Sequence, residues 1–380
     1  MRKLLIILGV PIDDLDMSQA LMRLEQFIAL GRSTGKSHQV ATINADFVVN
    51  SLNDSELRRI LQESDMATAD GMPLVLGARL LGVPLADRVT GADLVPALAE
   101  RAAQKGYSIF LLGARPGVGI RAAEILQERY PGLTIAGVIA PPNVPIQAMD
   151  RSILDQIKAA KPDILLVAFG NPKQEKWIRM YADTLAVPVC IGVGGTFDMI
   201  AGITKRAPGW MQRAGLEWLY RLIQEPHRLW RRYVHDLLYF GYFFLRQWWA
   251  MRQGALPAPL LPISETVIVD KTVILNIEGR MDIDTYSLVI ERADKALQMS
   301  PCVVVNLARA TFLDSTAMGA LVALANRARA AGGSLRLAAV PPVIARTLAL
   351  VRLDQFFEIF TDVETALDGT VSLIPMPQSV

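Results

Sequence analysis

The segment Asp163–Leu185, DILLVAFGNPKQEKWIRMYADTL, contains the pattern that decides the fold. A short apolar run ends at Gly170, and the residues after Pro172 have the spacing of an amphipathic helix. The same order recurs at SIFLLGA (108–114) and at VPVCIGVGG (187–195), each of which precedes a helical pattern. Short apolar strands that alternate with helices are typical of a parallel sheet, which binds ligands at the carboxyl ends of its strands. The sequence therefore predicts a Rossmann-like α/β domain over residues 1–204.

The composition restricts the class of protein. The chain has 380 residues, enough for two or three domains, and its 52% of hydrophobic residues excludes a disordered or fibrous chain. Lysine and arginine (39) nearly balance aspartate and glutamate (37), so we expect no nucleic-acid partner. The two cysteines, Cys190 and Cys302, and the three histidines form no disulfide or metal-binding pattern. We therefore expect no metal and a reducing, cytoplasmic setting.

Two apolar stretches raise the question of membrane contact. Residues 4–10 form a short run that leads into acidic residues, which favours a buried first strand over a signal peptide. Residues 237–245 are also apolar, but a membrane-spanning helix needs about 20 such residues. Residues 205–252 hold nine basic and three acidic residues among many aromatic ones. We expect residues 205–253 to form a helical appendage on an anionic membrane surface; an oligomer interface or a cover on the second domain is the alternative.

The chain continues into a second, smaller domain. Residues 254–263, GALPAPLLPI, contain three prolines and no charge, and are predicted to be a linker. Residues 264–372 again alternate strand-like and helical patterns, including the apolar run CVVVNL that starts at Cys302. They are predicted to form a small α/β domain.

Four clusters of small and polar residues follow predicted strands of the first domain. They are Thr42, Asn44 and Asp46; Asp70 and Gly71; Gly170, Asn171, Pro172, Gln174 and Glu175; and Gly192, Gly194, Gly195, Thr196 and Asp198. A glycine-rich turn into a helix exposes backbone N–H groups that can hold a diphosphate, with tight packing as the alternative. The segment FLLGARPGVG (110–119) departs from the GxGxxG pattern, so we expect no dinucleotide cofactor.

These motifs, taken in order, resemble the WecG/TagA/CpsF family of bacterial glycosyltransferases. The resemblance rests on TIN (42–44), ADGMP (69–73), VTGADL (89–94), GNPKQE (170–175), GVGGTFD (192–198) and the segment from Arg206 to Tyr233. It implies an inverting transfer without a metal, from a UDP-sugar to a sugar on a polyprenyl diphosphate at the inner face of the cytoplasmic membrane. The sugar is expected to be N-acetylmannosamine, its uronic acid or another hexose.

The resemblance also implies roles for individual residues. Asp70 matches the general base, Thr42 and Asn44 match positions near the sugar or base, and Gln174 matches a residue near the leaving diphosphate. The alternatives are an Asp-Gly turn at Asp70, capping at Thr42 and Asn44, and a helix start at Glu175. The remaining predicted substrate-binding residues are Gly71, Asn171, Pro172, Glu175, Gly194, Gly195 and Asp198.

Three arginines of the appendage match residues that act over the site in this family. Arg221, Arg228 and Arg231 would neutralise the leaving diphosphate by guanidinium contacts. Their spacing, together with Arg232, places them on one face of a continuous helix, whereas Pro226 would kink or break such a helix. A solvated basic face is the alternative.

Residues 264–372 resemble a STAS domain, the fold of anti-sigma factor antagonists. The resemblance rests on VVVNL (303–307) and FLDSTAMGAL (312–321). Ser315 matches the serine that regulatory members phosphorylate, but Ala317 stands where glycine is usual. Asp314 or Ser315 could instead cap the following helix. A protein partner of this domain is expected.

The sequence therefore predicts a membrane-associated glycosyltransferase of exopolysaccharide or surface-polymer synthesis, with a STAS domain for regulation or partner binding. UDP-sugar and a lipid-linked saccharide are its expected substrates, and a homo-oligomer is left open. The alternative is a scaffold without catalytic activity in which the STAS domain assembles a complex. A soluble nucleotide-sugar enzyme is a third hypothesis.

Overall fold

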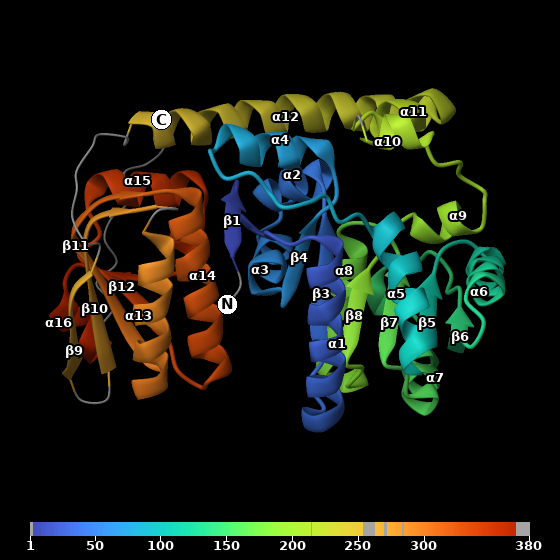
Figure 1. The fold of residues 1–380 in the computed structure, drawn as a ribbon, viewed down its shortest axis with the longest axis horizontal. Helices are drawn as coiled ribbons and strands as arrows, with labels where there is room; N and C mark the ends of the chain where they lie inside the picture. The colour runs from blue at the N-terminus through green and yellow to red at the C-terminus, as the bar shows by residue number, and fades with distance from the viewer. Residues whose placement is uncertain (1–2, 214, 254–262, 270–271, 283–284, 370–380) are drawn as a thin grey trace. The chain divides into compact units, whose positions relative to one another are not determined.

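The computed structural model describes residues 3–213, 215–253, 263–269, 272–282 and 285–369. These residues form two compact units, and Figure 1 shows their elements. Of the described residues, those within 15–76 and 85–240 make the six-stranded unit, and those within 3–14, 77–84 and 241–369 make the five-stranded unit. The predicted linker, 254–263, falls outside the described residues except for its last residue. Two of the four unit boundaries, 76/77 and 240/241, fall inside helices.

The six-stranded unit is built on a sheet in which every neighbouring pair of strands is parallel. The strand order is β4-β3-β8-β7-β5-β6. The strands are β3 (His38–Ile43), β4 (Met66–Ala69), β5 (Ser108–Gly113), β6 (Thr134–Ile139), β7 (Ile164–Ala168) and β8 (Val189–Gly192). This confirms the predicted parallel α/β architecture.

Helices connect these strands and cover both faces of the sheet (Figure 1). They are α1 (Met17–Thr34), α2 (Ala45–Asn53), α3 (Ser55–Glu63), α4 (Met72–Leu80), α5 (Gly91–Lys105), α6 (Val118–Arg129), the 3-10 turn η1 (Ile146–Ala148), α7 (Ser152–Ala160), α8 (Lys173–Leu185) and α9 (Thr196–Ile200). Successive side chains of strand β7 point to opposite faces of the sheet, and both faces are buried. Ile164 and Leu166 belong to the hydrophobic core on one face, and Leu165 and Val167 belong to the core on the other.

The predicted appendage forms three helices. They are α10 (Gly209–Arg213), α11 (Glu217–Gln224) and α12 (Pro226–Gln253). Pro226 is the first residue of α12, a position that tolerates its missing N–H, so Arg221 and Arg231 lie on separate helices. The expectation of one continuous helix is therefore wrong, and the expected break at Pro226 is confirmed.

The five-stranded unit combines a second sheet with the amino-terminal hairpin. The hairpin strands are β1 (Leu4–Ile7) and β2 (Val10–Asp13), and β1 is the expected buried first strand. The sheet has the order β13-β12-β11-β10-β9, with only β9 antiparallel to its neighbour. Its elements are β9 (Ile263–Val269), β10 (Thr272–Met281), α13 (Tyr286–Met299), β11 (Cys302–Leu313), α14 (Ser315–Ala330), β12 (Leu335–Ala338), α15 (Pro342–Leu350), η2 (Leu353–Gln355), β13 (Glu358–Phe360) and α16 (Val363–Asp368).

Candidate active site

The strand order brings the four predicted clusters together at one edge of the sheet. The clusters follow or end strands β4, β3, β8 and β7, which are consecutive neighbours in the sheet. Thr42 lies near the end of β3, Asp70 directly follows β4, Asn171 lies in the loop after β7, and Gly194 lies in the loop after β8. Because all four strands are parallel, their carboxyl ends lie on the same side (Figure 1). This edge is the candidate active site.

The carboxylate of Asp70 lies at the amino end of α5. Its Oδ2 accepts a hydrogen bond from the backbone N–H of Gly91 at 3.1 Å, and its own N–H donates to the carbonyl of Ile43 at 2.6 Å. Within the described part of the chain, the other carboxylate oxygen has no hydrogen-bond donor. Burial raises the pKa of Asp70 to about 6, while the Gly91 N–H and the charges of Arg88 and Arg221 act in the opposite direction. The group is therefore mostly ionised at pH 7 and is basic enough to accept a proton.

Gly91 allows the first turn of α5 to close on the strand ends. A Cβ there would lie 3.2 Å from Thr196 Oγ1 and 3.5 Å from Thr42 Oγ1. Both hydroxyls donate to the end of β8 and its loop, Thr42 to the Gly192 carbonyl at 3.1 Å and Thr196 to the Val193 carbonyl at 2.7 Å. Thr42 is buried, and its hydrogen bond links β3 to β8. Its role in the structure is therefore to stabilise the carboxyl ends of the two strands that carry the site.

Asn44 and Gly71 shape the loops on the β3–β4 side. The side-chain oxygen of Asn44 accepts from Phe47 N–H at 3.2 Å and caps α2, which is the capping alternative from the sequence. Gly71 has a φ of 152°, and a Cβ there would lie 3.6 Å from Asn44 Cβ. A residue with a side chain would be strained at that φ, so glycine lets the loop after Asp70 approach the start of α2.

Gln174 joins the loops after β7 and β8. Its side-chain oxygen accepts from the N–H groups of Gly170 and Gly194, each at 3.0 Å, and its Nε2 donates to Glu175 Oε1 at 2.8 Å. The side chain is 1% exposed, and a Cβ at Gly192 would lie only 2.5 Å from its Nε2. The structure therefore gives Gln174 a positioning role, because both ends of its amide are engaged by the protein.

Glu175 is the most perturbed carboxyl group of the edge. Burial raises its pKa to about 8, and the negative charge of Asp46 adds to this effect. Its Oε2 is buried, and the described residues offer it no hydrogen-bond partner. The neighbouring Asn171, which Pro172 separates from α8, donates from Nδ2 to Asp46 Oδ2 at 3.0 Å. Glu175 is therefore protonated at neutral pH and serves to orient the Gln174 amide.

The sequence did not identify Arg88, Arg206 and Glu217 as parts of the site. Arg206 Nη1 lies 2.6 Å from Asp93 Oδ1 in the first turn of α5, and its Nε lies 3.5 Å from Glu217 Oε1 on α11. Arg88 Nη2 lies 3.7 Å from the other oxygen of Glu217. This network attaches α11 to the start of α5, beside Asp70. Arg88 directly precedes the motif VTGADL, which is the signal that could have marked it.

The three predicted arginines of the appendage differ in their surroundings. Arg221 contributes positive charge at Asp70, and its Nη2 lies 3.7 Å from the position of a Cβ at Gly195. Arg231 is exposed on α12, with its guanidinium 5.5 Å from the ring centre of Trp230. The side chain of Arg228 lies outside the described residues. Of the two predicted arginines whose side chains are described, Arg221 is therefore the one near Asp70.

The structure also describes Asp198 and Ser315. Asp198, in the first turn of α9, accepts a hydrogen bond from Arg115 at 2.8 Å, so this acid has a protein partner.

Among the described residues, no three His, Cys, Asp or Glu side chains are grouped to hold a metal ion. Ser315 is 1% exposed at the start of α14, which Asp314 caps by accepting from Ala317 N–H at 2.7 Å.

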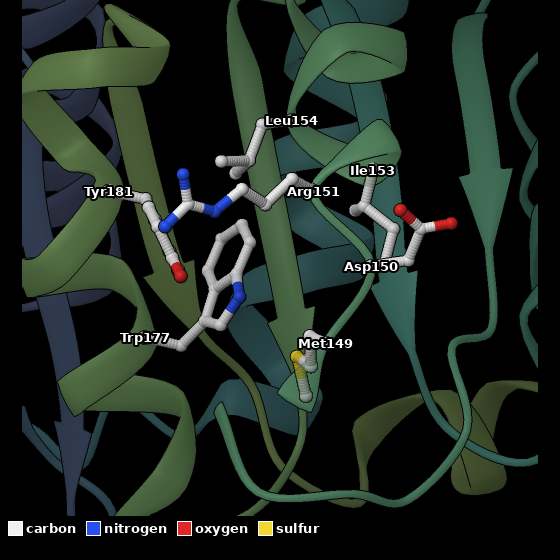
Figure 2. Close-up of a pocket in the computed structure, with 7 residues that line it drawn as sticks. All are labelled: Met149, Asp150, Arg151, Ile153, Leu154, Trp177 and Tyr181. Carbon is white, nitrogen blue, oxygen red and sulfur yellow. The ribbon is translucent and has the colours of Figure 1, made fainter. Parts of the chain in front are cut away.

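A small pocket lies elsewhere in the six-stranded unit (Figure 2). Residues of the 149–154 segment line it together with Trp177 and Tyr181 of α8. None of the predicted site residues lines it. The pocket is therefore separate from the edge that carries Asp70.

Comparisons with known proteins find relatives for both parts of the chain. An N-acetylglucosaminyldiphosphoundecaprenol N-acetyl-beta-D-mannosaminyltransferase of Bacillus spizizenii is 34% identical over 226 residues, covering 58% of this chain and 85% of that protein. The protein of the same name from Staphylococcus aureus strain MRSA252 is 32% identical over 225 residues, covering 59% and 86%. A solved anti-sigma factor antagonist from Mycobacterium paratuberculosis is 21% identical, covers 30% of this chain and 97% of that chain, and has a TM-score of 0.26.

The matches to family models cover most of the chain. A STAS domain model matches residues 264–366, which confirms that resemblance. The model of the glycosyl transferase WecG/TagA/CpsF family matches residues 5–254, which is more than half of the chain. The chain therefore belongs to the WecG/TagA/CpsF family of glycosyl transferases.

Proposed function

We propose that the chain transfers a sugar from a UDP-sugar to a saccharide on a polyprenyl diphosphate, with inversion at the anomeric carbon and without a metal. The names of the relatives support a polyprenyl-diphosphate acceptor and favour N-acetylmannosamine as the sugar. The observation that carries the proposal is the Asp70 carboxylate, which has one free oxygen and a pKa of about 6 at the edge where four strands end. The product would be a precursor of an exopolysaccharide or another surface polymer.

The proposed reaction uses Asp70 as a general base. As the acceptor hydroxyl attacks the anomeric carbon, its proton passes to the free oxygen of Asp70. The new bond forms on the face opposite the bond to UDP, and the electrons of that bond leave with the diphosphate. Arg221 and Arg88 supply positive charge near Asp70, where it would stabilise the charge that develops on the leaving group. The Gly194–Gly195 turn lies beside Arg221 and would border the diphosphate.

The outer surface of α11 and of the first half of α12 supports a peripheral position on an anionic membrane. Its exposed apolar residues are Trp218, Ile223, Trp230, Val234, Leu237 and Leu238. Arg231 and Arg232 are exposed among them. Aromatic and basic side chains together suit the headgroup level of a membrane. Among the described residues, a helix with the length and apolar composition of a membrane span is absent. We place the enzyme at the cytoplasmic face of the membrane, where UDP-sugars are available.

A transfer assay tests the proposal. Radiolabelled UDP-N-acetylmannosamine, its uronic acid and other UDP-hexoses are offered to a short-chain polyprenyl-diphosphate saccharide, with anionic liposomes and with or without EDTA. We expect one donor to react, EDTA to have no effect, and the product to have the anomeric configuration opposite to that of the donor. Absence of transfer from every donor, together with absence of UDP binding by calorimetry, would instead favour the scaffold hypothesis.

A further inference from the structure

Helix α14 is buried around its whole circumference in its first three turns. Every residue from Ser315 to Ala325 is buried. A helix that covers one face of a sheet normally buries a single stripe and leaves the opposite side in water. The outer side of α14 must therefore have a partner within the five-stranded unit, and the contacts identify it.

The first part of this partner is the amino-terminal hairpin. Strand β1 packs against α14, and all four of its residues are buried. Gly319 is the point of closest approach: a Cβ there would lie 2.7 Å from the carbonyl carbon of Leu4 and would collide with its oxygen. Ile6 belongs to the same hydrophobic cluster as Ala317 and Leu321. The absence of a side chain at position 319 thus lets the backbone of β1 lie directly on the helix.

The second part is the last segment of α12, which contributes Gln247. This side chain is completely buried, and its oxygen accepts from Leu8 N–H at 2.8 Å. Its Nε2 donates to the Ile6 carbonyl at 2.9 Å and to Ser315 Oγ at 3.2 Å. The Ser315 hydroxyl in turn lies 3.4 Å from the sulfur of Met251. One amide therefore joins the hairpin, α12 and the start of α14, and all of its polar atoms are used.

The hairpin turn is suited to burial. Its two central residues, Leu8 and Gly9, have φ values of 51° and 83°, as a tight two-residue hairpin requires. Asn or Gly is the usual choice at the first position, because a leucine there is conformationally costly. Leu8 is only 1% exposed, so burial of its side chain offsets that cost. The conformation of the turn is therefore stabilised by the burial of its leucine side chain.

We propose that the surface of the STAS domain around Ser315 is the docking site for this chain's own hairpin (residues 4–13) and for the last two turns of α12. Ser315 lies inside this contact, and the STAS domain holds the hairpin and the end of α12 in place. A phosphoryl group on Ser315 would bring about two negative charges into a closed apolar contact. Phosphorylation would therefore require the hairpin and α12 to leave first. This inference does not depend on the proposed transferase reaction.

Hydrogen–deuterium exchange of the full chain tests the docking. Gly319→Ala places a methyl group against Leu4, yet alanine is a better helix former than glycine, so the helix itself is not weakened. We expect the amides of residues 4–13 to exchange at least tenfold faster in this variant, with β10 and β11 still protected. Gly241→Ala is the matched control, because a Cβ at that helical glycine meets nothing within 4 Å. Unchanged exchange in the hairpin of Gly319→Ala, or equal loss throughout β10 and β11, would overturn the proposal.

Thiol labelling tests the accessibility of position 315 in an otherwise unaltered contact. Ser315→Cys should react with a maleimide at least a hundredfold more slowly than Thr311→Cys, which replaces an exposed residue of β11. The unsubstituted chain gives the background from Cys190 and Cys302. Adding Gly319→Ala to Ser315→Cys should restore fast labelling. Equal rates for Ser315→Cys and Thr311→Cys in the native chain would show that the surface is open and would refute the proposal.

Discussion

Replacing Glu175 by glutamine should make the six-stranded unit more stable at neutral and alkaline pH. Burial raises the pKa of this carboxyl group from 4.5 to about 8, and its Oε2 has no hydrogen-bond partner among the described residues. Between these two pKa values, the folded chain holds a proton that the unfolded chain has lost. The stability of the wild type therefore falls as the pH rises from about 4.5 to about 8, and then levels off.

The size of the effect follows from the same two pKa values. Each pH unit inside the window changes the free energy of unfolding by about 1.4 kcal/mol. The stability of Glu175→Gln relative to the wild type should thus increase by about 3 kcal/mol between pH 5.5 and pH 8. Other titrating groups, including Asp70, are common to both proteins and largely cancel in the comparison.

Urea unfolding of the full chain at several pH values measures this difference. The amides of β7 and β8, followed by pulsed hydrogen exchange, report on the six-stranded unit separately from the other unit. Glu100→Gln is the control, because Glu100 is an exposed glutamate of α5. A stability difference between Glu175→Gln and the wild type that stays constant within about 0.5 kcal/mol from pH 5.5 to 8 would refute the assignment of Glu175 as a buried, neutral acid.

Three further outcomes are expected. Gly192→Ala should destabilise the fold by about 1–3 kcal/mol in urea unfolding, because its methyl group would press on the Gln174 amide; Gly209→Ala, where a Cβ meets nothing within 4 Å, should not. The rate of sugar transfer should be constant above pH 7 and should fall about tenfold per unit below about pH 6, since Asp70 must be ionised to act as a base; a flat profile from pH 5 to 8 would exclude this role. Leu238→Asp should weaken sedimentation with anionic liposomes at least tenfold, whereas Leu30→Asp, at an exposed leucine of α1, should leave it unchanged.

The local patterns of the sequence predicted much of the fold. The apolar run before Gly170 is strand β7, and the helical spacing after Pro172 is helix α8, because burial on both faces and amphipathic spacing leave direct marks on a sequence. The positions of the polar clusters after strands were predictable for the same reason. That these clusters lie side by side depends on the strand order, which is set by contacts between residues far apart in the chain.

The roles of individual side chains were less predictable. The sequence could not show that Gln174 is engaged by two loops, since Gly170 and Gly194 come from different strands. Arg206 pairs with Asp93, which lies far away in the chain, so this contact could not be predicted from the sequence. The packing of the amino-terminal hairpin against α14 is also a long-range contact, which local sequence patterns do not reveal.

The most direct test of the central claim compares wild type and Asp70→Asn in single-turnover transfer at pH 7.5, with UDP binding measured by calorimetry. The substitution keeps the size of the side chain and its contact with Gly91 but removes the base. We predict that the rate of transfer falls by about 10²- to 10⁴-fold while the affinity for UDP changes less than threefold. Transfer by Asp70→Asn at the wild-type rate would contradict the account.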